Sequence, residues 1–244
     1  MRFRLALVWW CGGLAAQTPP PSPPAPPPAA VVAAGEALLR AHGERSRGLR
    51  VLVADYEQTR TTALAREPLR SRGRFLFVRQ PACIVFHATA PRASIVRLTG
   101  SVYEVFRPQQ QRLERFHLDG PELAQGLFAA VGGDTERLLA EFAVTACGPD
   151  PADPQRTRIT LQPRRPAVRE RVRELAVLLR QDGGALAAIA YRDPAGDLVE
   201  IELRAPVVDP DPAPSAEFEV PAGTRIVEHA APPRRDGSAD AQVR

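Results

Sequence analysis

The sequence contains few side chains arranged for catalysis. Its four histidines, at positions 42, 87, 117 and 229, are scattered and show no metal-ligand spacing. No GxSxG, HExxH, Walker or GxGxxG motif occurs. His87 and His117 could be neighbours near Ser94 or Ser101, but this spacing defines no catalytic triad. We therefore expect no enzymatic activity, no catalytic residues, no cofactor and no metal site.

The three cysteines could be lipidated, form a disulfide or remain as free thiols. Cys11 is preceded by Trp9 and Trp10, whereas a lipidated cysteine needs a small residue before it, so lipidation is not expected. Cys83 and Cys147 can form one disulfide in an oxidising compartment, or stay as two buried thiols. No pairing of a cysteine with a histidine is evident, so neither is expected to act as a nucleophile.

The N-terminal residues predict export. Arg2 and Arg4 precede a nearly continuous apolar stretch, and cleavage is expected after Ala16. The stretch is about half of the ~20 residues that a membrane-spanning helix needs. Residues 1–16 are therefore interpreted as a signal peptide that places the mature protein outside the cytoplasm, with a membrane anchor as the alternative.

Composition argues against nucleic acid as a partner. All 32 basic residues are arginines, and the formal net charge is only +4. Loss of Arg2 and Arg4 with the signal peptide would reduce this charge to +2. No basic stripe interleaved with aromatic residues is present, as a nucleic-acid surface would require.

The chain divides by composition into one domain and two flanking segments. Residues 17–30 are a proline-rich linker, which should form an extended spacer. Residues 31–229 are long enough for a single domain. Residues 230–244 are rich in Pro, Asp and Arg and are expected to be disordered.

Within the domain, the pattern predicts a leading helix, two runs of strands and a helical insertion between them. One helix is expected at residues 31–46, a second begins at residue 121, and a third begins after Asp134, which would be its N-cap. Five strands are expected between residues 73 and 118, and the others at 49–58, 142–146, 156–162, 174–181, 185–192 and 197–204. Residues 164–174 could instead begin a helix. Since only turns separate most strands, they should pair antiparallel.

Apolar residues occupy both faces of several expected strands. Phe75 and Phe77 point to one side, while Leu76 and Val78 point to the other. The strand at 197–204 instead alternates apolar and acidic residues, which predicts one wet face. A sheet of about eleven strands must curl as its twist accumulates. We expect an α+β fold in which an unclosed, half-barrel antiparallel sheet carries helices over its concave face.

Several motifs resemble, in their order along the chain, the periplasmic outer-membrane lipoprotein carriers of the LolA type. They are Tyr56–Gln58, Gly73–Pro81, Val85–Pro91, Ile95–Gly100, Val105–Pro108 and the closing Phe218–Gly223. The likeness covers most of residues 31–229. It departs from the family at Arg79, because Gln80 separates this arginine from Pro81, and at Thr99, which stands where the family has an aspartate.

The resemblance implies an unclosed barrel whose apolar cavity takes up acyl chains beneath a helical lid. Residues expected to line this cavity are Val53, Phe75, Phe77, Phe86, Val96, Tyr103, Phe106, Leu123, Leu127 and Phe128, although any of them could be ordinary core. Arg79 is the candidate for the arginine that holds the lid closed through hydrogen bonds to the lid backbone. The alternative is a solvated arginine at the end of a strand.

The function implied by this resemblance is transport without covalent chemistry. A monomeric periplasmic chaperone of a Gram-negative type envelope would accept lipoproteins from an inner-membrane exporter and deliver their acyl chains to an outer-membrane acceptor, touching the membrane surface transiently. One alternative is a regulatory domain of the RseB type that senses lipids or lipoproteins on the same fold. Another is a carrier of a different lipid.

Overall fold

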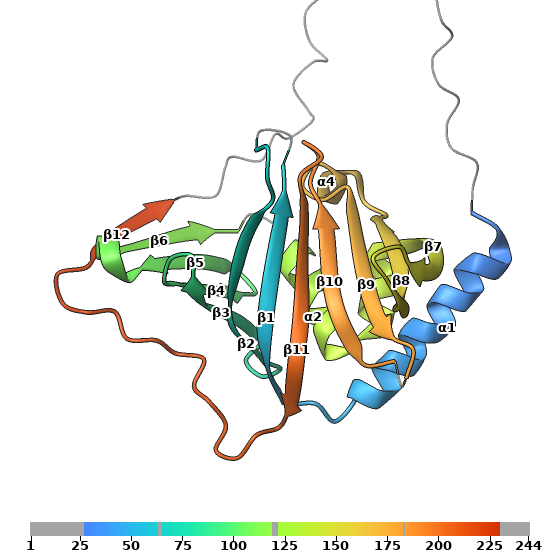
Figure 1. Cartoon of the computed structure of the whole chain (residues 1–244), viewed down its shortest axis with the longest axis horizontal. Coiled ribbons are helices and arrows are strands. Elements are labelled where there is room, and N and C mark those ends of the chain that lie inside the picture. The colour runs from blue at the N-terminus through green and yellow to red at the C-terminus, as the bar shows by residue number, and fades with distance from the viewer. Residues whose placement is uncertain (1–26, 63–64, 119–121, 183, 230–244) are drawn as a thin grey trace, which may run out of the picture.

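One large sheet dominates the computed structural model, which describes residues 27–62, 65–118, 122–182 and 184–229 (Figure 1). Twelve strands form this sheet in the order β12-β6-β5-β4-β3-β2-β1-β11-β10-β9-β8-β7. The first and last strands of this order are not paired with each other, so the sheet stays open. Helix α2 lies behind the middle of the sheet in Figure 1, and α1 runs along its right-hand side, near β7 and β8.

The first half of the chain runs from a helix into a meander. Its elements are α1 (Ala29–Ser46), β1 (Val51–Thr61), β2 (Leu69–Val78), β3 (Cys83–Ala90), β4 (Ser94–Thr99), β5 (Val102–Arg107), the short 3-10 helix η1 (Pro108–Gln110) and β6 (Arg112–His117). Each strand from β1 to β6 pairs antiparallel with the next, as expected from the turns between them.

The second half begins with the helical insertion and returns to the middle of the sheet. Its elements are α2 (Glu122–Gly132), α3 (Thr135–Glu141), β7 (Phe142–Asp150), β8 (Asp153–Pro163), α4 (Pro166–Arg169), β9 (Glu174–Arg180), β10 (Leu186–Arg192), β11 (Leu198–Val208) and β12 (Arg225–His229). Asp134 caps α3 by accepting a hydrogen bond from the amide of Arg137. Pairing of β11 with β1 joins the two halves into one sheet.

The expected fold class is confirmed, with two corrections. The sheet has twelve strands instead of about eleven, and β12 pairs parallel with β6, so the sheet is mixed and not purely antiparallel. The alternative of a long helix from residue 164 is wrong, because α4 is one turn long and β9 begins at Glu174. The predicted signal peptide and C-terminal tail lie outside the described residues, as does most of the proline-rich linker.

Helix α1 and the helical insertion fill the concave side over β7 to β9. Gly35 of α1 faces the side chains of Val144 and Cys147 on β7, so closely that an added Cβ would lie 2.8 Å from Val144. Gly126 of α2 likewise faces the ring of Phe142. These glycines let both helices approach the sheet closely, and the resulting core includes fully buried aliphatic residues from β8 and β9.

Long arginine side chains cover the convex side of β8 to β11. Beneath them lie Ala176, Leu178, Ala188 and Ala190, all nearly inaccessible to solvent. Arg158 of β8 reaches across this strip to Glu200 of β11, at 2.8 Å, and also pairs with the buried Asp150 at 2.9 Å. Arg156 similarly meets Glu202 at 3.1 Å. The small side chains make room for the aliphatic stems of the arginines, whose charged ends then meet acids.

The segment between β11 and β12, residues 209–224, covers the other half of the convex side, and we call it the strap. It appears in Figure 1 as the orange-red trace that runs from the lower end of β11 to β12. Phe218 of the strap stacks on Phe106 of β5 with ring centroids 5.9 Å apart, and the guanidinium of Arg97 lies over the Phe218 ring. Asp209 accepts hydrogen bonds from the amides of Arg50 and Val51 at the start of β1.

A buried glutamate links the strands beneath the strap. Glu104 of β5 is only 3% exposed and binds Arg97 of β4 at 2.5 Å and Arg115 of β6 at 2.7 Å. Arg97 also meets Glu217 of the strap at 2.6 Å. Burial alone would raise the pKa of Glu104, but hydrogen bonds and charge from both arginines outweigh it and lower the pKa. Glu104 is therefore ionised and stabilises the folded state near neutral pH.

We predict that Glu104→Gln lowers the free energy of unfolding by about 2 kcal/mol at pH 7, because the two arginines lose their shared anion. Since folding lowers this pKa below its ordinary value of 4.5, the contribution is fully present above pH 4.5 and is lost as the pH falls below it. Urea unfolding at pH 7 and at pH 3.5 measures this difference.

The matched control is Glu219→Gln, which changes an exposed glutamate of the strap. This variant should unfold as the parent does at both pH values. An equal loss of stability in both variants would contradict a specific role for the buried Glu104.

Candidate functional site

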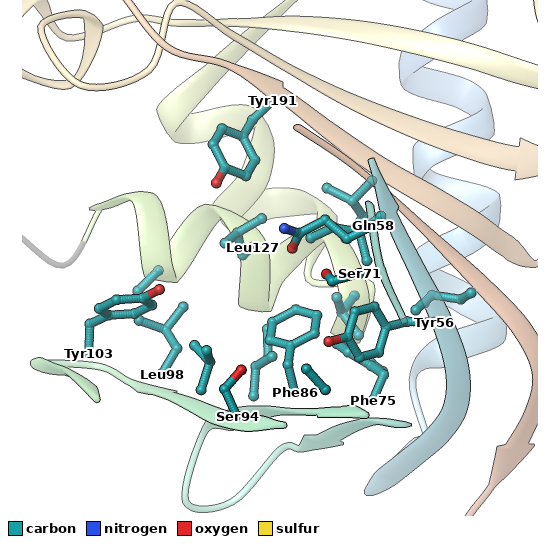
Figure 2. A pocket seen from close by; sticks show the side chains of 18 of the residues that line it. Tyr56, Gln58, Ser71, Phe75, Phe86, Ser94, Leu98, Tyr103, Leu127 and Tyr191 are labelled. Carbon is teal, nitrogen blue, oxygen red and sulfur yellow. The ribbon is translucent and has the colours of Figure 1, made fainter. Parts of the chain in front are cut away.

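An apolar cavity of about 580 Å³ lies between the concave face of the sheet and α2 (Figure 2). Its wall is formed by Tyr56, Gln58, Ser71, Phe75, Ile84, Phe86, Ala88, Pro91, Arg92, Ser94, Val96, Leu98, Tyr103, Leu118, Ala124, Leu127, Val131, Arg171, Ile189, Tyr191, Ile201 and Leu203. Strands β1 to β5, β10 and β11 contribute most of these residues. The volume falls within the ~300–1,000 Å³ typical of small-molecule sites.

One face of α2 forms the roof of the cavity. Ala124, Leu127 and Val131 line it, and their spacing of three and four residues places them along the same side of a helix. Figure 2 shows Leu127 above the rings of Phe75 and Phe86. A displacement of α2 would therefore open the cavity along its length.

The sheet opposite α2 carries small side chains, and these leave the space unfilled. Ser71, Ala88 and Ser94 line the wall, and the register places Ala88 beside both Gly73 and Ser94. A Cβ on Gly73 would lie only 1.9 Å from the carbonyl oxygen of His87, so no larger residue fits without separating β2 from β3. The sheet is irregular at this point, where the β2–β3 register shifts between Arg72 and Gly73.

Aromatic rings form the floor of the cavity. The ring of Phe86 packs edge-on against Tyr56 at 5.1 Å and lies 5.3 Å from Phe75. Such edge-to-face and tilted contacts are favourable arrangements for aromatic pairs. They hold the rings in place against the sheet, so the floor is preformed and does not depend on a ligand.

Most of the polar side chains on the cavity wall are neutral. Gln58, Ser71 and Ser94 point into it in Figure 2, together with the hydroxyl of Tyr56. Burial raises the pKa of Tyr56, and a hydrogen bond with Ser71 only partly offsets this effect. The interior can therefore offer hydrogen bonds to an ester or amide, and the charged groups among the wall residues are the solvent-exposed Arg92 and Arg171.

Arg79, at the end of β2, joins the C-terminal end of α1 to that of α2. Its guanidinium donates to three backbone carbonyls, those of Leu49 at 2.5 Å, Ser46 at 2.8 Å and Gly132 at 2.7 Å. The last of these belongs to α2, the helix that roofs the cavity. These contacts exclude a fully solvated side chain, and the role of Arg79 in holding a lid closed stays a prediction.

A second contact attaches α2 to α1. The His42 ring on α1 lies with its Nε2 3.1 Å from the carbonyl oxygen of Ala130, and the side chain is 5% exposed. Since a carbonyl can only accept, Nε2 carries the proton in this contact. Burial lowers the pKa of His42, so the ring is neutral under ordinary conditions. Both links hold the C-terminal half of α2, and neither holds its N-terminal end.

The residues expected to line a cavity are divided between the two faces of the sheet. Phe75, Phe86, Val96, Tyr103 and Leu127 do lie on the cavity wall. Phe77 and Phe128 belong to the filled core, where Phe77 packs beneath Gly132. The side chain of Leu123 is outside the described part of the structure.

Val53 and Phe106 are corrections, because both face the convex side. Val53 packs with Leu76, Cys83 and Val85 beneath the strap. Phe106 stacks on Phe218 of the strap. On strands that are apolar on both faces, alternation separates the two faces but does not reveal which one is concave.

Of the two alternatives for the cysteines, the structure shows free thiols and no disulfide. Cys83 and Cys147 are both free thiols, the first buried on β3 and the second half-buried on β7. Six strands separate β3 from β7 in the sheet. At about 4.8 Å per strand this distance is far beyond the ~4.4–6.8 Å that a disulfide allows between Cα atoms. Burial raises the pKa of Cys83 to about 11, which keeps this thiol protonated and unreactive.

Several wall residues were absent from the sequence-based set. They include Tyr56 and Gln58 of β1, Ile189 and Tyr191 of β10, and Ile201 and Leu203 of β11. The alternation in β11 already marked Ile201 and Leu203 as facing the core. What it did not indicate is that β11 pairs with β1, which brings both residues beside the meander.

Within the described residues, no group of three His, Cys, Asp or Glu side chains is placed to hold a metal ion. None of the helices in those same residues is both long enough and apolar enough to cross a bilayer.

Comparison with known proteins gives a similarity of fold only. No family model and no curated protein matches the sequence. Solved structures with a similar arrangement include a LolA superfamily protein from Nitrosomonas europaea, at 12% identity and a TM-score of 0.38, covering 73% of this chain and 96% of the other. At TM-scores below 0.5 such likenesses do not indicate a function, and the cavity itself must support any inference.

Two further solved structures show the same low level of similarity. The lipoprotein LppX from Mycobacterium tuberculosis matches at 15% identity and a TM-score of 0.40, over 72% of this chain and 97% of its own. The MucA/MucB complex from Pseudomonas aeruginosa matches at 11% identity and a TM-score of 0.40, over 75% of this chain and 59% of the other.

We predict that Arg79→Leu loosens α2, because three carbonyls at the ends of α1 and α2 lose their charged donor. Amide hydrogen exchange in the C-terminal half of α2 should become about tenfold faster or more, while exchange in β8 and β9 stays unchanged. Mass spectrometry of peptic fragments measures both regions in one experiment.

Arg74→Leu serves as the control, since Arg74 lies on β2, the strand directly before Arg79, and is exposed. Its exchange pattern should match that of the parent protein. If Arg79→Leu leaves the exchange of α2 unaltered, Arg79 does not hold this helix.

Proposed function

We propose that this protein is a periplasmic carrier that shelters an acyl chain of a lipoprotein in the cavity and transfers it between membranes without covalent chemistry. The observation that supports this proposal is the cavity, whose wall is mostly apolar and which α2 roofs. A polar, water-soluble metabolite would form few hydrogen bonds with such a wall. A hydrocarbon chain would find an environment that matches it along its whole length.

The size of the cavity suits one chain. A methylene group occupies close to the ~30 Å³ of a water molecule, so the cavity holds on the order of twenty such groups. Each buried methylene contributes ~0.8 kcal/mol, and a chain of twelve would gain about 10 kcal/mol. Binding this tight requires a mechanism of release, and a cargo with several chains requires the cavity to widen.

The attachment of α2 supports such a mechanism. Arg79 and His42 hold its C-terminal half, so a swing about that end would lift Ala124 and Leu127 away from the floor. Opening would expose the apolar wall. Exposure of that wall is costly in water but not against a membrane surface, which favours hand-over at a membrane.

A regulator that senses lipid would bind the same ligand without passing it on, so transfer is the property that distinguishes the two functions. Purified mature protein should carry bound acyl lipid, identified by mass spectrometry of a solvent extract. It should also extract lipoproteins from inner-membrane vesicles and deliver them to acceptor vesicles. Protein that binds lipid but releases none would indicate the sensor, and protein without any affinity for lipid would refute both.

We predict that Ser94→Phe blocks ligand binding by filling the cavity, because Ser94 points into it from β4. Exclusion of two methylenes already costs about tenfold in affinity, so a fluorescent fatty acid should bind at least about tenfold more weakly. Titration of the fluorescence gives the dissociation constant directly.

The matched control is Ser101→Phe, which places the same ring on the exposed turn between β4 and β5. Its affinity should equal that of the parent. Equal weakening in both variants would show that the added ring, and not the filled cavity, is responsible.

A further inference from the structure

The wall of the cavity carries a polar side chain whose hydrogen-bonding capacity is unused. Gln58 of β1 is half-buried, and Figure 2 shows its carboxamide pointing into the cavity. No hydrogen bond joins this carboxamide to any other residue in the part of the chain that the structure describes. Because side chains alternate along a strand, the preceding Glu57 faces the convex side, where it meets Arg204 at 2.9 Å. The outward-facing group thus has a partner, whereas the inward-facing one has none among the described residues.

The surroundings of Gln58 are largely apolar. Ile201 of β11 lies directly opposite it in the register, and Ile189 of β10 lies opposite Ile201. Both isoleucines line the cavity, as does Leu127 of α2. A hydrocarbon chain that fills the cavity would therefore displace water from the carboxamide without replacing its hydrogen bonds. Such a loss is unfavourable unless the ligand itself carries a polar group at this position.

Ser71 and Tyr56 place two hydroxyl groups beside Gln58. The register pairs Ser71 of β2 directly with Gln58, and the Cβ atoms of such cross-strand pairs lie about 4.5–5.5 Å apart. Tyr56 precedes Gln58 by two residues on the same face of β1, and its hydroxyl hydrogen-bonds with Ser71. The carboxamide and both hydroxyls can donate hydrogen bonds. Together these three side chains form a small group of donors on an apolar wall, which we call the polar subsite.

The polar subsite lies away from the end of the cavity where α2 is attached. Phe75, in the floor, is opposite Ala54 of β1, and Gln58 follows Ala54 by four residues, or about 13 Å along the strand. Arg79, which holds the C-terminal end of α2, directly follows Val78 at the end of β2 that pairs with the start of β1. The floor therefore lies between the polar subsite and the attached end of α2. A bound chain can extend its tail along the floor and present its other end at Gln58.

We propose, in an inference that rests on the proposed function, that the polar subsite binds the carbonyl group of an acyl ester or acyl amide, the linkage that joins an acyl chain to a lipid or lipoprotein. A carbonyl oxygen has two lone pairs, so it can accept one hydrogen bond from Gln58 and another from Ser71. Neither linkage carries a net charge, which suits a subsite made of neutral groups. The tail lies along Phe75, and the rest of the ligand extends toward the end of β1.

The polar subsite gives the protein a selectivity that the apolar wall alone cannot give. Hydrophobic burial favours the ligand with the greatest apolar surface, so it does not favour an ester over an alkane of the same length. A site with hydrogen-bonding groups rejects a ligand that lacks the matching group, because the polar groups of the site then lose water and gain no partner. The carbonyl contact also fixes how far the tail enters the cavity.

The test compares methyl dodecanoate, N-methyldodecanamide and tetradecane, three ligands of similar length, each displacing the fluorescent hydrocarbon diphenylhexatriene from the full mature protein. The variant Gln58→Leu replaces the carboxamide by an apolar group of similar size. It should bind the ester, the amide or both about tenfold more weakly than the parent does, and should bind tetradecane at least as tightly. Retained binding of tetradecane also shows that the variant is folded. The relative losses for the ester and the amide identify which linkage the subsite prefers.

A spectroscopic measurement reports the contact itself. The infrared carbonyl band of bound methyl dodecanoate, isotopically labelled at its carbonyl carbon, should lie at lower frequency in the parent protein than in Gln58→Leu, because a hydrogen bond weakens the carbonyl bond. The matched control is Gln162→Leu, the same change at an exposed position of β8. Its affinities and its carbonyl band should equal those of the parent.

Unchanged affinity of Gln58→Leu for the ester and the amide, with an unshifted carbonyl band, would overturn this inference and leave the acyl-chain cavity intact. An equal loss of affinity for tetradecane and for both carbonyl compounds would also overturn it, because Gln58 would then only shape the cavity. Failure of all three ligands to bind the parent protein would refute the proposed function itself, and the inference with it.

Discussion

The whole structure depends on how an open sheet with apolar residues on both faces is shielded from water. A closed barrel would hide one face inside itself, but this sheet has two free ends and must cover its concave face with helices. The chain supplies α1, α2, α3 and the single turn of α4, which fill the space over β7 to β9 and reach the middle of the sheet only with α2. The cavity is the part of the concave face that the helices cover without filling.

On the convex face, arginine side chains and the strap shield the apolar residues from water, in place of helices. Arg156 and Arg158 lie over the alanine-rich strip of β9 and β10, and the strap covers the apolar cluster around Val85. The arginine stems lie over the small side chains of β9 and β10, and the ring of Phe218 stacks on that of Phe106. Both faces carry apolar residues, but the convex face also carries paired arginines and glutamates, and the larger apolar core lies on the concave face.

Much of the fold could be predicted from the sequence, since turns and alternation define β2 to β6 and the β10–β11 hairpin locally. Features that depend on pairing between strands far apart in the sequence could not be predicted. The parallel partner of β12 and the meeting of β11 with β1 arise only in the folded sheet. For the same reason Val53 and Phe106 were placed on the wrong face, and the sequence could not decide between a Cys83–Cys147 disulfide and two free thiols. Arg79 was found through its motif, but its three carbonyl partners come from segments far apart in the chain.

The route of the strap has a consequence for the order in which the molecule assembles. To reach β6, the chain must leave β11 and pass six intervening strands before β12 can pair. That pairing closes a long loop and gains little until β1, β5 and β6 are in place, so it belongs among the last steps of folding. By the same reasoning β12 and the strap are the first parts to detach when the protein is stressed, and the edge of β6 would then be the first backbone offered to a neighbouring chain.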